Sequence, residues 1–158
     1  MLFFFLVFKE DKLMSERFKV PVGIFVIFRN EDKVLLQLRQ NCSFSGYWGF
    51  VGGHLDGNEQ IILAAIREAK EEVGVDIRSE DLTLKTICHS NKGEEYIQFY
   101  FECCKWSGEI ENKEPSKCEC LVWHEWNKLP EKTCPYLKEA VKKINKGISF
   151  YEDEFDIK

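Results

Sequence analysis

Long hydrophobic runs are absent from this sequence of 158 residues. The apolar run at its amino end, Met1–Phe8, is far shorter than the roughly 18 residues that a membrane span needs. No basic residues precede it, so it makes a poor secretory signal. A polar start follows at Ser15. We therefore expect residues 1–14 to be an extension or mobile tail, with translation beginning at Met14, and we expect a cytoplasmic protein with no membrane partner.

Positive charge is also scarce. Lys and Arg number 22 against 27 Asp and Glu, which gives a formal net charge of −5. Proteins that bind nucleic-acid polymers broadly present a basic surface, so this balance argues against such a partner. It leaves room for a phosphorylated small molecule, because a bound divalent cation can reverse the sign of the electric field inside a cleft.

The seven cysteines lack a regular spacing. Neither Cys118-Glu119-Cys120 nor Cys103-Cys104 has the paired two-residue spacers that are typical of zinc sites. An odd number of cysteines without a secretory signal indicates reduced thiols in a cytosolic protein. We interpret these cysteines as small residues on strands, and regard zinc binding as the less favoured alternative.

No internal repeat or linker divides the chain, so we expect residues 15–158 to form one domain. Segments rich in β-branched and aromatic residues predict strands at Val20–Phe28, Val34–Leu38, Trp48–Val51, Leu82–Cys88, Tyr96–Cys104 and Cys120–Trp126. Helical spacing predicts helices at Glu59–Val73 and Thr133–Lys146, followed by a frayed acidic tail from Gly147. These elements predict an α+β fold.

The first predicted helix has a start signal, an apolar stripe and a stop signal. Asn58 is the expected N-cap, with Glu59 in the first turn, and Gly74 is the expected terminating glycine. The stripe consists of Ile62, Ile66, Ala69 and Val73.

Three carboxylates, Glu68, Glu71 and Glu72, lie on the second half of this helix. Residues three and four apart share a helical face, so Glu68 lies beside both of the others and the three repel one another unless a cation binds. Mg²⁺ suits such oxygen ligands. The ordinary alternative is a solvated helix face. The pair Gly52-Gly53 favours the metal site, because glycine lets the backbone come close to a ligand.

The spacing of Gly53, Glu59 and Arg67-Glu68-Ala69-Lys70-Glu71-Glu72-Val73-Gly74-Val75 resembles the Nudix box. The Trp106–Glu109 segment and Glu114 are similar to the MutT-like branch of that family. The run from Glu114 to Pro130 is similar to nucleoside triphosphate diphosphatases, including the human enzyme that acts on thiopurine nucleotides. The resemblance covers about residues 18–147 and implies an α/β/α sandwich in which the catalytic helix and a carboxy-terminal helix pack on a mixed sheet.

The resemblance also implies a ligand set for Mg²⁺, with Mn²⁺ as a substitute. The implied ligands are Glu68, Glu71, Glu72, Glu114 and the carbonyl of Gly52. Glu59 and Arg67 are implied to form a supporting ion pair that holds the metal loop against the helix. Family members usually have proline before the two glycines, whereas this chain has Val51, which restricts φ less.

The implied reaction is attack of water on a phosphorus of a nucleoside diphosphate linked to another group. The residues leave the general base open between Glu71 and Glu68. We expect Trp48, His54 and Trp123 to contact substrate. The alternatives are core packing for the two tryptophans and a solvated loop position for His54. The leading hypothesis is a nucleoside triphosphate diphosphatase that favours purines or oxidised purines such as 8-oxo-dGTP.

Two further hypotheses stay open. One is hydrolysis of dinucleoside polyphosphates or nucleotide sugars. The other is a nucleotide-binding regulator without catalysis, which the intact Glu68, Glu71 and Glu72 disfavour. Homodimers are common among family members, so a homodimer is a further expectation from the resemblance, although the sequence itself gives no sign of one.

Overall fold

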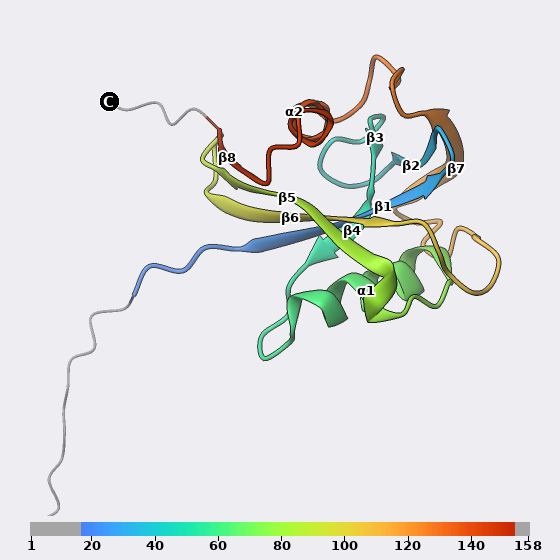
Figure 1. Cartoon of the computed structure of the whole chain (residues 1–158), viewed down its shortest axis with the longest axis horizontal. Helices are drawn as coiled ribbons and strands as arrows, with labels where there is room; N and C mark the ends of the chain where they lie inside the picture. The colour runs from blue at the N-terminus through green and yellow to red at the C-terminus, as the bar shows by residue number, and fades with distance from the viewer. Residues whose placement is uncertain (1–16, 154–158) are drawn as a thin grey trace, which may run out of the picture.

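The computed structural model describes residues 17–153 (Figure 1). The expectations for residues 1–14 and for a start at Met14 lie outside this range. The strands are β1 (Val22–Asn30), β2 (Lys33–Arg39), β3 (Trp48–Gly49), β4 (Val51–His54), β5 (Leu82–Ser90), β6 (Tyr96–Cys103), β7 (Cys118–Glu125) and β8 (Phe150–Glu152). The helices are α1 (Ile61–Val73), α2 (Pro135–Asn145) and a short 3-10 turn at Ser79–Asp81.

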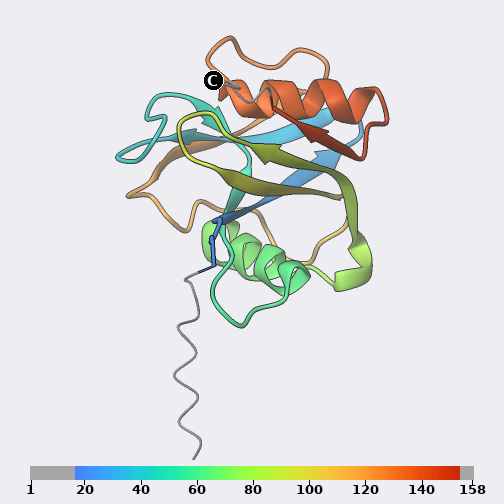
Figure 2. The ribbon, with the colours of Figure 1, turned by 90° about the vertical axis from the view of Figure 1, so that its left-hand side faces the viewer.

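Strand β1 is the centre of a mixed sheet. It runs parallel to β6 and antiparallel to β4, and its last residues pair with the start of β2. Beyond β6, the sheet continues through antiparallel β5 to parallel β8. On the other side, β2 pairs with β3 and β7 in an antiparallel group. Helices α1 and α2 lie on opposite sides of this sheet in both views (Figure 1, Figure 2). The predicted α+β sandwich is therefore confirmed.

Both faces of β1 are buried. Ile24 and Val26 belong to the core on the α1 side. Phe25 and Ile27 belong to the core on the α2 side. Because successive side chains of a strand point to opposite faces, a strand covered on both sides reads as a continuous apolar run, which is how this segment reads in the sequence.

Helix α1 begins later than predicted. Its N-cap is Gln60, whose side chain makes no capping hydrogen bond, so the assignment of Asn58 as N-cap is wrong. Asn58 has a φ of 64°, which places it in the left-handed region rather than the extended conformation of an N-cap. Glu59 consequently lies before the helix and is free to pair with a side chain farther along it.

The apolar stripe of α1 is also shifted. Ile62 is 40% exposed, whereas Ala64, Ala65 and Ala69 are fully buried. Small side chains on the buried face let the helix approach β4 closely. This close approach brings the glutamates of α1 to the glycines of β4.

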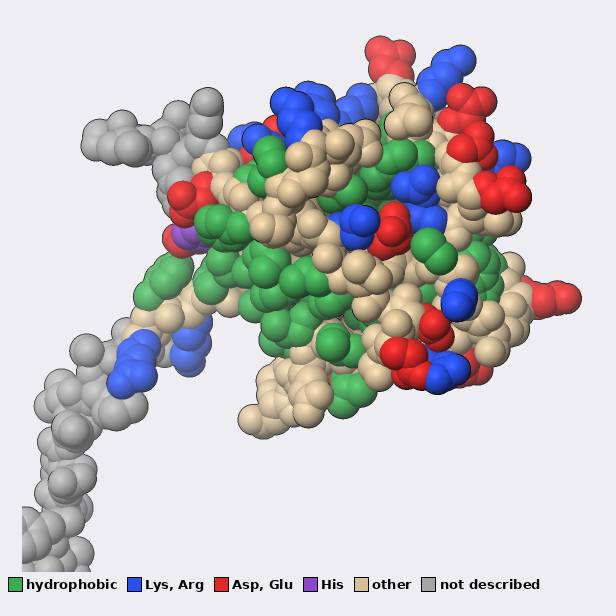
Figure 3. All heavy atoms as spheres, in the orientation of Figure 1, with side chains coloured by type: hydrophobic (Ala, Val, Ile, Leu, Met, Phe, Trp, Pro, Cys, Tyr) green, Lys and Arg blue, Asp and Glu red, His purple; other side chains and the backbone are tan. Residues whose placement is uncertain are grey.

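The predicted frayed tail is wrong for the residues that follow Gly147. Phe150–Glu152 form β8, which pairs with β5, and Tyr151 is only 7% exposed. All seven cysteines are free thiols, four of them buried. No helix in the described range is long and apolar enough to cross a membrane. Figure 3 shows hydrophobic side chains gathered toward the centre-left of the visible face, with charged side chains mainly around them.

Candidate active site

Two glycines of β4 form the point at which the sheet meets α1. Gly52 has a φ of 151°, and a Cβ there would lie 2.0 Å from the carbonyl oxygen of Ile24. At Gly53 a Cβ would lie 2.5 Å from Oε1 of Glu68. A side chain at Gly52 would clash with the backbone of β1, and one at Gly53 would displace the carboxylate of Glu68. The glycine pair is therefore required by packing as well as by turn geometry.

Glu72 is a partly buried carboxylate that accepts two hydrogen bonds from β4 and β2. Its Oε2 accepts the backbone N–H of Gly52 at 2.8 Å and the amide of Gln37 at 3.3 Å. Burial, with the neighbouring charges of Glu68 and Glu114 adding to it, raises the pKa of Glu72 to about 8. No Lys or Arg forms an ion pair with it among residues 17–153. Within the described residues this carboxyl group therefore has hydrogen-bond donors but no ion-pair partner.

Arg67 ties the loop before α1 to the helix. Its Nε and Nη2 donate to the two carboxylate oxygens of Glu59 at 2.8 and 3.1 Å, and Nη2 also donates to the carbonyl of His54 at 3.0 Å. The expected pair of Glu59 and Arg67 is present. The hydrogen bonds from Arg67 lower the pKa of Glu59, whereas the partnership with Glu59 raises the pKa of Arg67.

The same guanidinium also contacts two of the candidate ligands. Nη1 of Arg67 donates to Glu68 at 2.8 Å and to Glu71 at 3.2 Å. Glu68 is almost buried, and this burial raises its pKa despite the arginine. Glu71 is more open, with 55% of its side chain exposed.

Glu114 approaches from the loop before β7. Its carboxylate pairs with Lys117 at 3.2 Å, and this hydrogen bond raises the pKa of the lysine. Together with the glutamates of α1 it lines a cavity of about 360 Å³, which we call the carboxylate pocket. The pocket is also lined by Gln37, Arg39, Cys42, Gly52, Gly53, His54, Asp56 and Lys117.

A second cavity, of about 440 Å³, opens beside the first and is called the aromatic pocket here. Its ring-bearing walls are Phe25, Phe44, His54, Tyr96 and Tyr136. Tyr136 contacts two of the other rings, with its centroid 5.8 Å from that of Phe25 and 5.5 Å from that of Phe44. Phe44 is 46% exposed, so its ring is available to a flat ligand.

The two pockets adjoin each other. Both are lined by Arg39, Gly52, Gly53 and His54. Arg39 forms no ion pair among the described residues; its Nε donates to the carbonyl of Ser43 at 2.9 Å. An unpaired cation between an aromatic wall and a carboxylate cluster suits a ligand with a flat ring and an anionic chain.

The predicted substrate residues are placed differently from one another. His54 is exposed, lines both pockets and lies 5.8 Å from the ring of Tyr96. Trp48 packs against His124, with ring centroids 4.7 Å apart, and lines neither pocket. Trp123 also lines neither pocket and stacks on Trp106 at the α1 side of the sheet.

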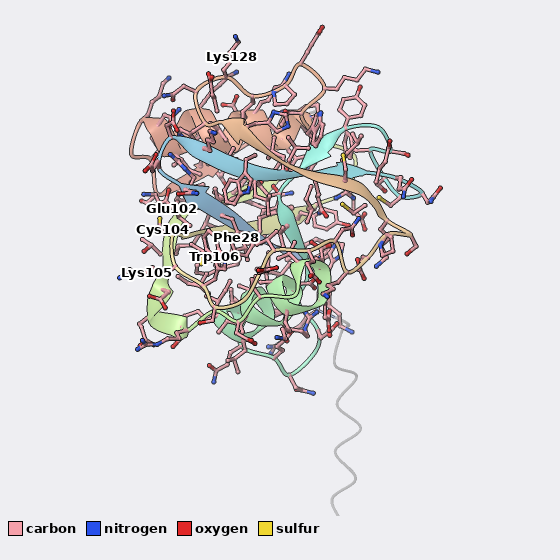
Figure 4. The ribbon with its side chains drawn as sticks, turned by 90° about the vertical axis from the view of Figure 1, so that its right-hand side faces the viewer. Phe28, Glu102, Cys104, Lys105, Trp106 and Lys128 are labelled. Carbon is pink, nitrogen blue, oxygen red and sulfur yellow. The ribbon has the colours of Figure 1, made fainter. Side chains whose placement is uncertain are left out.

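Trp123 is partly buried and packs against the core on the α1 side. Figure 4 shows the labelled Phe28 and Trp106 close together, and their rings lie 5.4 Å apart edge to face. The structure therefore brings His54 to the pockets and leaves both tryptophans in packing positions.

The NUDIX domain model matches residues 17–144. The chain belongs to the Nudix family of hydrolases. This Nudix hydrolase is 30% identical over 112 residues to the 8-oxo-dGTP diphosphatase of Proteus vulgaris, an alignment that covers 70% of this chain and 96% of that protein. It is 36% identical over 67 residues to the dihydroneopterin triphosphate diphosphatase of Escherichia coli (strain K12), covering 42% of this chain and 45% of that protein.

Solved structures give the same family. The crystal structure of the MutT NUDIX hydrolase from Burkholderia pseudomallei matches with a TM-score of 0.73 and 26% identity, covering 78% of this chain and 97% of that chain. The MutT-like resemblance seen in the sequence is thereby confirmed.

The acidic side chains of this Nudix hydrolase fit a hard divalent cation in chemistry. Glu72 has no cationic partner in residues 17–153, and the charges of Glu68 and Glu114 act on it from nearby. In the same range, no three acidic, histidine or cysteine side chains are already arranged to hold a metal ion. Glu68 instead forms an ion pair with Arg67 at 2.8 Å. The type of donor therefore fits such an ion.

Several residues that line the adjoining pockets were not predicted from the sequence. They are Arg39, Phe44, Gln98, Lys117 and Tyr136. They come from separate segments that the sheet and α2 bring together, so no local spacing marks them. The only sequence signal was a polar loop between β2 and β3 that contains a single phenylalanine.

Proposed function

We propose that this Nudix hydrolase cleaves a nucleoside triphosphate to a nucleoside monophosphate and pyrophosphate in the presence of Mg²⁺, with Mn²⁺ as a substitute. Purines or oxidised purines such as 8-oxo-dGTP are the favoured substrates. The observation that carries the proposal is that the aromatic and carboxylate pockets adjoin each other. They share lining residues that include Arg39 and Gly53. The Proteus vulgaris relative is named for 8-oxo-dGTP, which supports the choice of an oxidised purine as the nucleobase.

In this proposal the metal ligands are Glu68, Glu71, Glu72, Glu114 and the carbonyl of Gly52. The bound ion supplies charge neutralisation for the phosphates and makes a bound water more acidic. Glu72 is supported by its desolvation and its lack of a cationic partner among the described residues. Glu114 is supported by its position across the carboxylate pocket from α1.

Arg67 and Glu59 act as positioning residues. Their paired hydrogen bonds hold the loop that carries His54 against α1, so that the carboxylates face the glycines of β4. His54 and Arg39 line the junction of the pockets and are proposed to contact the phosphate chain.

The general base is Glu71 or Glu68. Glu71 is the more exposed and can reach a water molecule without displacing its neighbours. Glu68 is closer to the glycines but already accepts a hydrogen bond from Arg67. Glu71→Gln and Glu68→Gln can be separated by pH profiles of turnover, because loss of the base removes the acidic limb of the profile whereas loss of a ligand raises the required metal concentration.

The nucleobase is proposed to lie in the aromatic pocket against the rings of Phe44 and Tyr136. Contact with the substrate, which was expected of Trp48 and Trp123, is thereby assigned to rings that line the cavity. Gln98, from β6, lines the same pocket and accepts a hydrogen bond from Tyr100 at 3.0 Å, which leaves its amide N–H groups for a base edge.

The test is a nucleotide panel assayed with Mg²⁺ for both pyrophosphate and phosphate release. Pyrophosphate from a triphosphate supports the proposal. Ready cleavage of sugar nucleotides or dinucleoside polyphosphates, with triphosphates inert, would replace it with the second hypothesis. Tight binding of nucleotides without turnover would identify a regulator. Glu72→Gln is the control for contaminating phosphatases.

A further inference from the structure

Two loops that belong to different pockets are joined by hydrogen bonds. Residues 40–47, called the base loop, carry Phe44 into the aromatic pocket. Residues 113–117, called the acidic loop, carry Glu114 into the carboxylate pocket. The base loop donates to three consecutive carbonyls of the acidic loop: the amide of Gln40 to Pro115 at 2.6 Å, the amide of Asn41 to Ser116 at 2.9 Å, and the backbone N–H of Gln40 to Lys117 at 2.8 Å.

The base loop has little freedom of its own. Asn41 and Phe44 have φ values of 53° and 58°, in the left-handed region, which is unfavourable for a bulky side chain such as Phe44. Arg39 fixes the loop at its root, because its Nε donates to Ser43 and its carbonyl accepts the N–H of Gly46 at 2.7 Å. A ligand ring that displaces the side chain of Phe44 would therefore move the base loop as a unit.

The acidic loop is held equally tightly around Glu114. The carbonyl of Glu114 accepts the N–H groups of Lys117 and Cys118, both at 2.9 Å. Its own N–H donates to the side chain of Asn112 at 3.1 Å. Displacement of the carbonyls of this loop therefore displaces Glu114 with them.

We propose that Gln40 and Asn41 are positioning residues that couple occupancy of the aromatic pocket to the placement of Glu114 in the carboxylate pocket. The inference rests on the proposed function. A nucleobase bound against Phe44 shifts the base loop as a unit, and the three hydrogen bonds transmit that shift to the acidic loop. Because coupling between two sites is reciprocal, a nucleoside strengthens binding of the metal and the metal strengthens binding of the nucleoside.

The probe for the aromatic pocket is deoxyguanosine, which has no phosphate and so no direct bond to a metal. The probe for the carboxylate pocket is Mn²⁺, whose free concentration is read from its electron paramagnetic resonance signal. In the unaltered protein, saturating deoxyguanosine should tighten Mn²⁺ binding by about fivefold or more. This readout is independent of turnover.

The decisive variant combines Gln40→Met and Asn41→Gly. Methionine keeps the length of the side chain without a donor, and glycine accepts the positive φ of Asn41. We expect the effect of deoxyguanosine on Mn²⁺ affinity to fall below about twofold. The matched control is Asn58→Gly, because Asn58 also has a positive φ, of 64°, but its side chain makes no hydrogen bond within residues 17–153. This control should keep the full coupling.

Survival of the coupling in the double variant overturns the inference, as does an unaltered protein that binds deoxyguanosine without any change in Mn²⁺ affinity. If the double variant fails to fold by circular dichroism, Gln40→Met alone carries the test, and it should lose at least half of the coupling free energy. Absence of deoxyguanosine binding also overturns the inference, while pyrophosphate release by the same preparation would still support the proposed function.

Discussion

Replacing Glu72 with glutamine separates its role in metal binding from its role in folding. In the metal-free protein, burial raises the pKa of Glu72 from 4.5 to about 8, so near neutral pH the side chain is mostly protonated. Glutamine has the same shape and can still accept the backbone N–H of Gly52. The substitution should therefore cost little stability without metal, while it removes the anionic charge on which metal binding depends.

The sign of the pH dependence follows from the raised pKa. Between pH 4.5 and about 8 the folded protein keeps a proton on Glu72 that the unfolded chain has released, so this group's contribution to the free energy of unfolding falls as pH rises. The whole window is worth at most about 5 kcal/mol, at about 1.4 kcal/mol per pH unit. The variant lacks this loss, because glutamine does not titrate.

The assay is urea denaturation with a chelator at about pH 5 and about pH 9, repeated with Mg²⁺ at the higher pH. Without metal, the variant should match the unaltered protein at low pH and exceed its stability at high pH. With Mg²⁺, the unaltered protein should gain stability and the variant little. Turnover should fall by about 100-fold or more. Near-normal Mg²⁺-dependent turnover, or equal destabilisation at both pH values, would refute the reasoning.

The other predictions concern the surroundings of this carboxylate. Gly53→Ala places a methyl group 2.5 Å from Oε1 of Glu68 and should raise the metal concentration for half-maximal turnover, whereas Gly57→Ala, which meets nothing within 4 Å, should not. Arg67→Lys loses the two-point pairing with Glu59 and should lower turnover by about 10- to 100-fold without unfolding the protein, as checked by circular dichroism. Phe44→Ala removes a stacking ring worth about 1–3 kcal/mol and should raise KM for the nucleotide by about 5- to 150-fold; an unchanged KM would place the base elsewhere.

Local patterns in the sequence predicted the glutamates that line the carboxylate pocket. Helical geometry alone puts Glu68 beside Glu71 and Glu72, whatever the helix packs against. The pairing of Glu59 with Arg67 followed from the family spacing and is present. The start of the helix was misplaced because Asn58 suits both an N-cap and a left-handed turn, and only the turn is realised.

The aromatic pocket and strand β8 depend on long-range contacts, which the sequence pattern did not predict. The aromatic pocket combines Phe44 from a loop, Gln98 from β6 and Tyr136 from α2. No periodicity relates these residues, and the sheet order that brings β1 beside β6 is set by long-range contacts. Strand β8 was missed because its acidic neighbours favour a solvated tail, although Tyr151 contributes to the core on the α2 side.

The central claim is that the adjoining pockets cleave a nucleoside triphosphate between its α- and β-phosphates. Its most direct test is a stoichiometric assay of 8-oxo-dGTP and dGTP with Mg²⁺, in which the monophosphate and pyrophosphate are both quantified. We expect one pyrophosphate for each monophosphate formed, with activity lost on chelation and in Glu72→Gln. Release of single phosphates, or triphosphates that stay intact with Mg²⁺ present, would contradict it.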